Sequence, residues 1–197
     1  MAPRWQRPHR NERVRAAAVG LFLALALPAC RVKKAAPIQL IAGPAAEDRI
    51  EFVPQAAFAE YFELEGLRNE LRITLTSYQA SCHDFAAPKA REVSVVISVI
   101  APAGTALGSG TYAWAGHEAH GGTAAKPEKT FAAPTVRIGG RGFALPPGGT
   151  LELKSVSKAL NGSIGGYLAF EFPGDADQSA TSLRGNFDAK LCRVSVP

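Results

Sequence analysis

Few segments of this 197-residue chain group side chains that could do chemistry. The most suggestive is His117-Glu118-Ala119-His120, because two histidines and a glutamate can bind a metal ion and activate a water molecule. Metal hydrolases place such histidines four residues apart on a helix, whereas His117 and His120 are three apart among Gly and Ala residues that do not favour a helix. A metal-binding protein or hydrolase using the His117/His120 loop is therefore the alternative prediction for function.

Two other groups are weaker. Cys82-His83-Asp84 contains a nucleophile, a base and a carboxylate, but direct neighbours in a strand or turn cannot all face one reaction centre. The run Asp175 to Ser179 is similar to the start of a calcium loop, but Ala180 stands where glycine is needed and Asn186 where a bidentate glutamate is needed. We therefore predict no catalytic residues, no metal site and no cofactor, and a protein that is not an enzyme.

The first 30 residues predict where in the cell the protein is located. A basic segment precedes the apolar run Ala16 to Leu27, which ends at Pro28-Ala29-Cys30. A basic start, a short apolar run and a small residue before the cleavage point are typical of a secretory signal peptide. The run is shorter than the roughly 20 apolar residues that a membrane-spanning helix needs.

The Ala29-Cys30 junction resembles the lipobox of bacterial lipoproteins. This resemblance implies that residues 1–29 are removed and that Cys30 becomes the lipidated N-terminus, with an acyl chain such as palmitate on its amino group. Arg31 follows where an aspartate would resemble an inner-membrane retention signal, so the expected location is the outer membrane. The alternative is an ordinary signal peptide cut near the same bond, which would give a soluble periplasmic protein.

The net charge of +5 comes mostly from the predicted leader. Without the leader's five arginines and one glutamate, the chain keeps 17 basic and 16 acidic residues. A nearly neutral mature chain does not indicate a nucleic-acid partner, and we predict none.

Of the three cysteines, two remain after Cys30 is assigned to lipid. Outside the cytoplasm the environment is oxidising, so Cys82 and Cys192 are predicted to form a disulfide. We expect the bridge to pin the last strand to the end of the Leu71–Leu75 segment. Two free buried thiols are the alternative.

The remaining sequence predicts one all-β domain at residues 49–197, an antiparallel β-sandwich or flattened barrel, after a tether at residues 30–48. Ile38–Ile41 could instead be an edge strand. Residues 58–67 fit a strand or a short helix, and 93–100 a central strand covered on both faces. Residues 117–134 have the composition of a surface loop. Further short strands are expected at 50–53, 71–75, 110–114, 135–138 and 143–145.

The C-terminal third is the most regular. Strands at 151–156, 167–172 and 183–191, with a strong turn signal at Asn161-Gly162, predict an antiparallel meander. The segments Gly110–Tyr112, Gly149–Leu151 and Gly185–Cys192 also resemble uncharacterised bacterial lipoproteins. That resemblance implies an all-β module and brings no known catalytic residues.

The leading functional prediction is therefore a membrane-anchored envelope lipoprotein with a non-enzymatic β-domain that binds a partner or serves envelope structure. Its expected partners are membrane lipid, through acylated Cys30, and an envelope protein or glycan.

Overall fold

The computed structural model describes residues 37–41, 49–114, 116, 122–123, 126–144, 147–172 and 181–196. The leader, Cys30, the His117–His120 group and the Asp175–Ala180 segment lie outside these residues. The expectations for lipidation and for a metal at His117/His120 therefore stay predictions.

Within the described residues the secondary structure consists of strands and turns. The strands are β1 (Ile38–Ile41), β2 (Arg49–Phe52), β3 (Ala56–Leu64), β4 (Arg68–Thr76), β5 (Val93–Pro102), β6 (Gly110–Ala113), β7 (Gly122–Thr123), β8 (Lys126–Pro127), β9 (Phe131–Ile138), β10 (Arg141–Ala144), β11 (Thr150–Val156), β12 (Ser163–Phe172) and β13 (Thr181–Ser195). The prediction of a single all-β domain is confirmed. In the part of the chain that the structure describes, no helix is long and apolar enough to cross a membrane.

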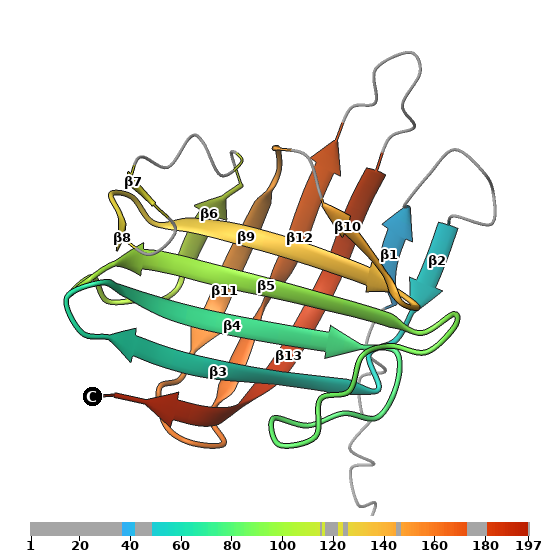
Figure 1. Cartoon of the computed structure of the whole chain (residues 1–197), viewed down its shortest axis with the longest axis horizontal. Helices are drawn as coiled ribbons and strands as arrows, with labels where there is room; N and C mark the ends of the chain where they lie inside the picture. Colours follow the sequence, from blue (N-terminus) through green and yellow to red (C-terminus); the bar gives the residue numbers. More distant parts are fainter. Residues whose placement is uncertain are drawn as a thin grey trace, which may run out of the picture. The chain divides into compact units, whose positions relative to one another are not determined.

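One curled sheet contains all of these strands except the β7–β8 pair, and it forms a half-barrel (Figure 1). Its main path runs β10-β9-β5-β4-β3-β13-β12-β11-β6, and β1 and β2 extend beside β13. The predicted meander is present as β11, β12 and β13, and Asn161 has the positive φ (64°) of the turn that joins β12 to β11.

Three details differ from the sequence-based expectation. The sheet is mixed, because the end of β13, Lys190–Ser195, pairs with β3 in parallel. The folded sheet already includes Ile38–Ile41, inside the segment predicted as a tether, because this strand pairs with both β13 and β2. Strand β9 begins at Phe131, inside the predicted loop, because its apolar residues Phe131 and Ala132 pair with the end of β5.

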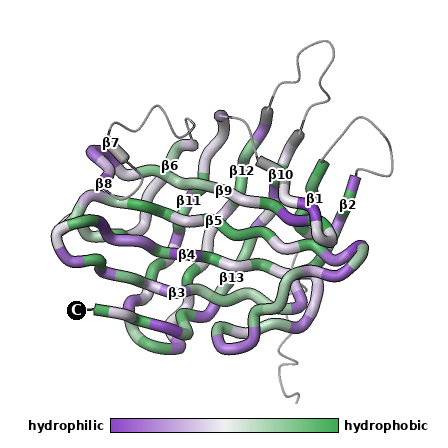
Figure 2. The backbone as a smooth tube through the Cα atoms, in the orientation of Figure 1, coloured by the Kyte–Doolittle hydropathy of each residue, from purple (hydrophilic) through white to green (hydrophobic). Residues whose placement is uncertain are grey.

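Apolar and polar residues alternate along the strands, and the apolar ones form the core. Leu71, Ile73 and Leu75 of β4 are buried on one face, and Leu151, Leu168 and Leu183 come from the opposite side of the half-barrel. These side chains belong to one continuous hydrophobic cluster, as their period of two predicts. Figure 2 shows hydrophobic residues along strands such as β5 and hydrophilic residues in the turns.

The other face of β3, β4, β5 and β9, called here the outer face, points away from that core. Polar residues on it are nonetheless buried: Glu70, Thr74 and Thr76 of β4 and Ser94 of β5 are at most 3% exposed. The central strand β5 is thus covered on both faces, as predicted from its sequence. Part of the cover comes from the segment between β4 and β5, residues 77–92, which we call the covering loop.

Candidate functional site: a groove on the outer face

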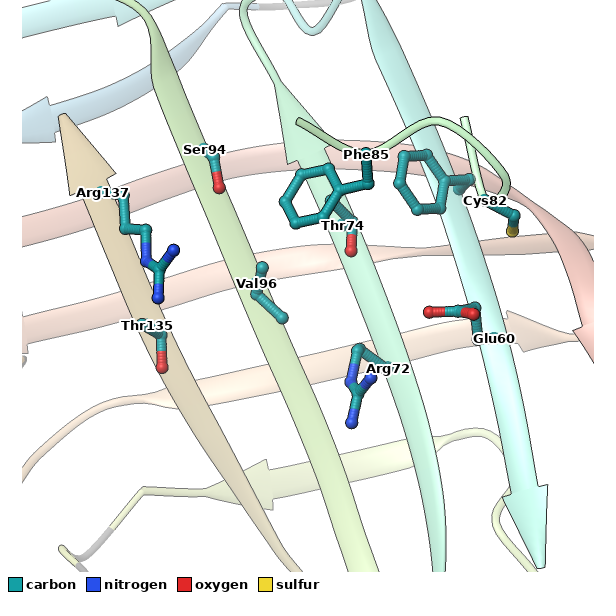
Figure 3. A pocket seen from close by; sticks show the side chains of 10 residues that line it. Glu60, Arg72, Thr74, Cys82, Phe85, Ser94, Val96, Thr135 and Arg137 are labelled. Atoms are coloured by element: carbon teal, nitrogen blue, oxygen red, sulfur yellow. The ribbon is translucent and has the colours of Figure 1, made fainter. Parts of the chain in front are cut away.

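A groove of about 370 Å³ lies on the outer face, beneath the covering loop (Figure 3). The four strands β3, β4, β5 and β9 form its floor, and the covering loop contributes one wall. Its lining residues are Phe58, Glu60, Arg72, Thr74, Cys82, Phe85, Ser94, Val96, Thr135 and Arg137.

The strand register explains why these residues meet. In antiparallel strands, residues that pair directly place their side chains on the same face. One row across the floor therefore consists of Phe58, Thr74, Val96 and Thr135, which pair in succession. The rows on either side add the pairs Ser94–Arg137 and Glu60–Arg72. The groove thus has a middle row of two apolar side chains and two threonines, with a polar pair towards each end.

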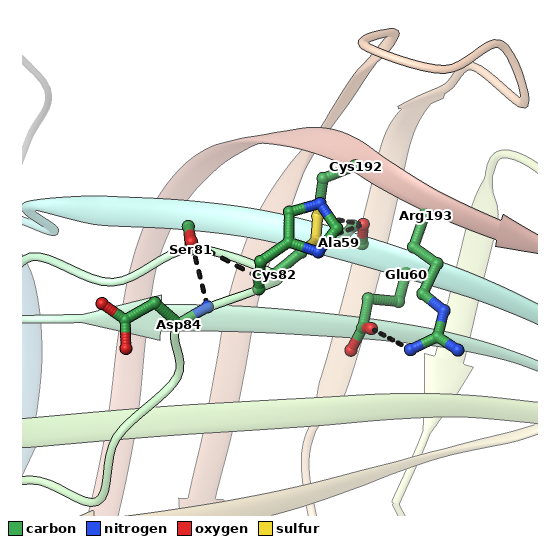
Figure 4. Close-up of a disulfide and its surroundings, with 8 residues drawn as sticks. Ala59, Glu60, Ser81, Cys82, Asp84, Cys192 and Arg193 are labelled. Atoms are coloured by element: carbon green, nitrogen blue, oxygen red, sulfur yellow. Dashed lines mark hydrogen bonds and ion pairs between the residues drawn. A yellow bond between two sulfur atoms is a disulfide. The ribbon is translucent and has the colours of Figure 1, made fainter.

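The disulfide holds the covering loop in place. Cys82 and Cys192 are bonded across a sequence separation of 110 residues, with their Cα atoms 6.2 Å apart, inside the usual range for a bridge. Figure 4 shows the bridge passing over β3, and Sγ of Cys192 and of Cys82 lie 3.1 and 3.9 Å from the carbonyl oxygen of Ala59. The pairing of these cysteines is confirmed.

The position of the bridge differs from the expected one. Because β3 lies between β4 and β13, the end of β4 does not neighbour the last strand. Instead, the covering loop folds back over β3 so that Cys82 reaches Cys192. The bridge therefore fixes the wall of the groove and not the end of a strand. Phe85, three residues after Cys82, packs edge-on against Phe58, with ring centroids 6.0 Å apart and an interplanar angle of 75°.

Local hydrogen bonds shape the rest of the covering loop. The backbones of Ser81 and Asp84 bond to each other in both directions, at 3.0 and 3.2 Å. The hydroxyl of Tyr78 donates to the carbonyl oxygen of Ala86 at 2.7 Å. Asp84 and His83 are exposed, and Cys82 has no thiol because it is in the disulfide. Cys82-His83-Asp84 is therefore a turn segment and does not form a nucleophile and its base.

Arg72 is fixed by a buried carboxylate beside it on β4. Its Nε and Nη2 donate to Oε1 of Glu70 at 3.2 and 2.9 Å, and Ser98 Oγ donates to the same oxygen at 2.9 Å. Arg68 Nη2 donates to the other carboxylate oxygen, also at 2.9 Å. The Arg72 guanidinium further stacks over Phe62, 5.0 Å from the ring centroid. Arg72 therefore shares the single negative charge of Glu70 with Arg68, and these hydrogen bonds fix its position.

Glu60, opposite Arg72, also has a partner. Its Oε1 lies 3.8 Å from Nη1 of Arg193, whose guanidinium lies 5.7 Å from the Phe62 ring centroid on the same surface. Two of the three charged residues that line the groove are thus matched by ionic neighbours.

Arg137 is the third. Among the described residues it forms no ion pair or hydrogen bond, and its side chain is exposed. Its charge acts electrostatically on Tyr78 of the covering loop. Burial raises the pKa of that phenol and the negative charge of Glu92 raises it further, whereas a hydrogen bond to Ser94 and the positive charge of Arg137 lower it. The Tyr78 ring is therefore neutral in the physiological range.

Ser94 completes this end of the groove. Its side chain is only 1% exposed. The Tyr78 hydroxyl of the covering loop lies against it, and the hydrogen bond between the two side chains lowers the pKa of that phenol. Figure 3 shows Ser94 on the floor of the groove beside Arg137, its direct pairing partner on β9. The group at this end of the groove that forms no ion pair or hydrogen bond among the described residues is therefore Arg137, an exposed cation suited to an anionic acceptor.

The sequence alone did not identify this site. Alternation predicts that Thr74 and Arg72 point away from the core, but many solvent-exposed strands show the same pattern. The informative signal is Ser94, which with Ser98 is one of two polar residues in a strand that is otherwise apolar. No group of three or more metal-binding side chains occurs among the described residues. Neither protein-family models, nor curated proteins, nor solved structures match this chain when compared with it.

Proposed function

We propose that this chain is a lipid-anchored binding protein of the bacterial envelope and that the outer-face groove is its binding site. One observation carries the binding role: Arg137 lines the groove, is exposed, and forms no ion pair or hydrogen bond among the described residues. A cation without a partner that lines a concave site can bind a ligand group of opposite charge.

The chemistry of the groove supports binding over catalysis. Its cysteine is held in a disulfide, and Arg72 and Glu60 are engaged by Glu70 and Arg193. The groove combines apolar side chains, among them Phe58, Phe85 and Val96, with polar and charged ones, and its volume of 370 Å³ lies within the usual range of small-molecule sites. The disulfide supports the extracytoplasmic location that the leader and Cys30 predict, because such bridges persist in oxidising compartments.

Native mass spectrometry of the full chain, purified from bacterial membranes into lipid nanodiscs, tests the binding role. Val96→Trp fills the middle of the groove, while Val53→Trp adds the same ring at an exposed position after β2. We expect a non-covalently bound small molecule on the wild type and on Val53→Trp and none on Val96→Trp. No bound molecule on any of the three, or the same one on all three, would contradict the proposal.

Detergent-phase partitioning tests the anchor. Replacing Cys30 with serine removes the thiol that would carry lipid, so Cys30→Ser is expected to move from the detergent phase to the aqueous phase. Partitioning identical to the wild type would refute lipidation at Cys30 and would not bear on the binding role of the groove.

A further inference from the structure

We infer that the covering loop docks on the anionic phospholipid surface of the membrane, with Phe85 inserted among the lipids and Lys89 and Arg91 at the headgroups. This inference rests on the lipid anchor proposed at Cys30 and does not depend on what the groove binds. It has three supports, which are the place where the tether ends, the apolar tip of the covering loop and the charges around that tip.

The tether from Cys30 ends close to the covering loop. Eight residue steps separate Cys30 from Ile38, and at no more than about 3.6 Å each they span about 30 Å at most. Ile38 pairs with Phe52, and Gln55, just before β3, donates its backbone N–H to the carbonyl oxygen of Thr76, the residue that precedes the covering loop. Figure 1 shows the start of β3, the end of β4 and the start of β5 together at the right-hand end of the sheet, with the covering loop below them. A lipid on Cys30 would therefore hold this end of the sheet near the membrane surface.

The covering loop presents an apolar tip to solvent. Residues 85–87, a phenylalanine and two alanines, are all exposed. Within the described residues, Phe85 (44% exposed) is the one aromatic residue among the exposed large hydrophobic side chains. The disulfide at Cys82 and the hydrogen bond from Tyr78 to the carbonyl oxygen of Ala86 hold the tip in place, so little conformational freedom is lost when it binds. Phenylalanine beside basic residues is typical of elements that lie in the membrane interface.

Four cations surround this tip, and we call them the basic corner. Its members, all exposed, are Lys89, Arg91, Arg137 and Arg141. The first two belong to the covering loop, and the others lie on either side of the β9–β10 turn. The turn packs against the loop, because the Gly139 N–H donates to the carbonyl oxygen of Glu92 at 2.9 Å and a Cβ on Gly139 would lie 3.6 Å from the Cα of Ala90. The fold thus brings two pairs of cations from separate turns to one end of the sheet.

The charge at this end of the sheet is positive. Over residues 77–92 and 137–141, the four cations outnumber the two carboxylates, Asp84 and Glu92, which leaves a net charge of +2. Glu92 also accepts a hydrogen bond from the Lys89 N–H at 2.7 Å, inside the loop. The sequence between Cys30 and Ile38 adds three more basic residues and no acidic one. Basic residues clustered beside a lipid anchor are attracted to anionic headgroups, and an acyl chain and a basic patch together give stable membrane binding.

Fluorescence quenching on the anchored protein tests this inference. Phe85→Trp places an indole at the tip. Leu67→Trp places one in the β3–β4 turn, at the other end of β4, where Leu67 is equally exposed (46% against 44%). The full chain, purified from bacterial membranes, is reconstituted into nanodiscs of phosphatidylcholine with brominated acyl chains, alone or in an equal mixture with phosphatidylglycerol. After subtraction of the wild-type signal, we expect quenching of Phe85→Trp in the mixed discs, weaker quenching without phosphatidylglycerol, and none of Leu67→Trp.

Charge variants of Phe85→Trp locate the attraction. Adding Lys89→Gln and Arg91→Gln should lower the ratio of docked to undocked loops about 5-fold for each charge removed, the effect of one basic residue near an anionic membrane. Adding Lys129→Gln and Lys154→Gln removes the same number of exposed cations outside the basic corner and should leave the quenching unchanged. Circular dichroism of each variant verifies that it is folded.

The inference would be overturned if the quenching of Phe85→Trp were absent from the mixed discs, equally strong without phosphatidylglycerol, matched by Leu67→Trp, or unchanged by Lys89→Gln with Arg91→Gln. These outcomes, on protein that stays with the discs, refute the docking alone. Protein that does not stay with discs of either kind would refute the anchor at Cys30 and the docking with it.

Discussion

Gly165 and Gly166 are adjacent on β12 but face different neighbours. A Cβ on Gly166 would overlap the carbonyl oxygen of Glu152 and come within 2.8 Å of the ring of Phe187, the residue with which Gly166 pairs on β13. A Cβ on Gly165 would meet the side-chain oxygen of Ser155 at 3.0 Å, and this exposed hydroxyl can rotate away at the loss of the hydrogen bond that it accepts from the Gly165 N–H (3.1 Å). The two positions therefore form a matched pair for testing how tightly β11, β12 and β13 are packed.

Gly166→Ala is expected to lower the free energy of unfolding by about 1–3 kcal/mol, the usual cost of overfilling a packed site. Gly165→Ala should cost less than about 1 kcal/mol. Urea denaturation of both variants and the wild type measures the difference. Equal transition midpoints for the two variants would show that the Phe187 ring and the β11 backbone can move aside at little cost.

The ionisation of Tyr61 is expected to lower the stability of the folded protein in alkaline solution. Burial, the hydrogen bond to Glu63 (2.9 Å) and the charge of that carboxylate together raise its pKa from 10.0 to about 12. The folded protein therefore holds the phenol proton more tightly than the unfolded chain does. This contribution to stability is complete below pH 10.0 and is lost as the pH rises towards about 12.

The measurement is the free energy of unfolding of the wild type and Tyr61→Phe over this pH range. The wild type should lose more stability than the variant between pH 10.0 and 12, because only the wild type has this proton to lose. Phenolate absorbance gives an independent reading, since Tyr61→Phe should lack the last-titrating component. Parallel stability curves would mean that the pKa of Tyr61 is the same in both states.

At the scale of elements, the covering loop depends on its disulfide. Replacing Cys82 and Cys192 together with alanine should lower the free energy of unfolding by about 2–5 kcal/mol, the usual range for a long-range bridge. It should also free the loop from β3, because the bridge crosses that strand. Trypsin would then cut faster after Lys89 and Arg91, two exposed residues of the loop.

Wild-type protein treated with a reductant is the matched control and should be cut at the same two sites. Unchanged cleavage in the double variant would show that the loop is held by Phe85 and its backbone hydrogen bonds, and that the bridge is not needed to form the groove wall.

The sequence predicted the individual strands better than it predicted which strands pair with one another. Residues 93–100 were correctly identified as a central strand because β-branched residues occupy both faces, and the β11–β13 meander followed from alternation. The parallel pairing of β13 with β3 was not predicted, because a period of two shows which face is buried and not which strand lies alongside. The groove was missed for the same reason, since Ser94 and Arg137 become neighbours only through the register of β5 and β9.

At the scale of the whole molecule, β13 is the strand on which the sheet closes. It pairs with β12 along ten residues, with β1 through Ser182–Arg184, and with β3 through Lys190–Ser195. Its inward side chains Leu183, Ala189 and Leu191 are at most 1% exposed. Removing it would expose the edges of three other strands and one side of the core.

A chain that ends at residue 180 should therefore fail to fold. We expect it to lack the cooperative thermal transition and the far-ultraviolet β signal of the intact chain, and to be digested rapidly by protease. A chain that lacks only residues 196–197 keeps every residue of β13 and should behave as the wild type. A folded, protease-resistant product from the shorter chain would show that β3 and β12 can associate without the strand between them.

The position of β13 also determines the order in which the strands can pair during synthesis. A polypeptide is synthesised from its N-terminus at roughly 5–20 residues per second, so the strand that lies between β3 and β12 is made after every other strand described here. The early hairpins β3–β4 and β4–β5 can form from neighbours in sequence, but their outer edge at β3 must wait for residues more than 100 positions later. During synthesis there is therefore an interval in which the edge of β3 is unpaired and can pair with strands of other chains. Any delay in the synthesis of β13 lengthens that interval.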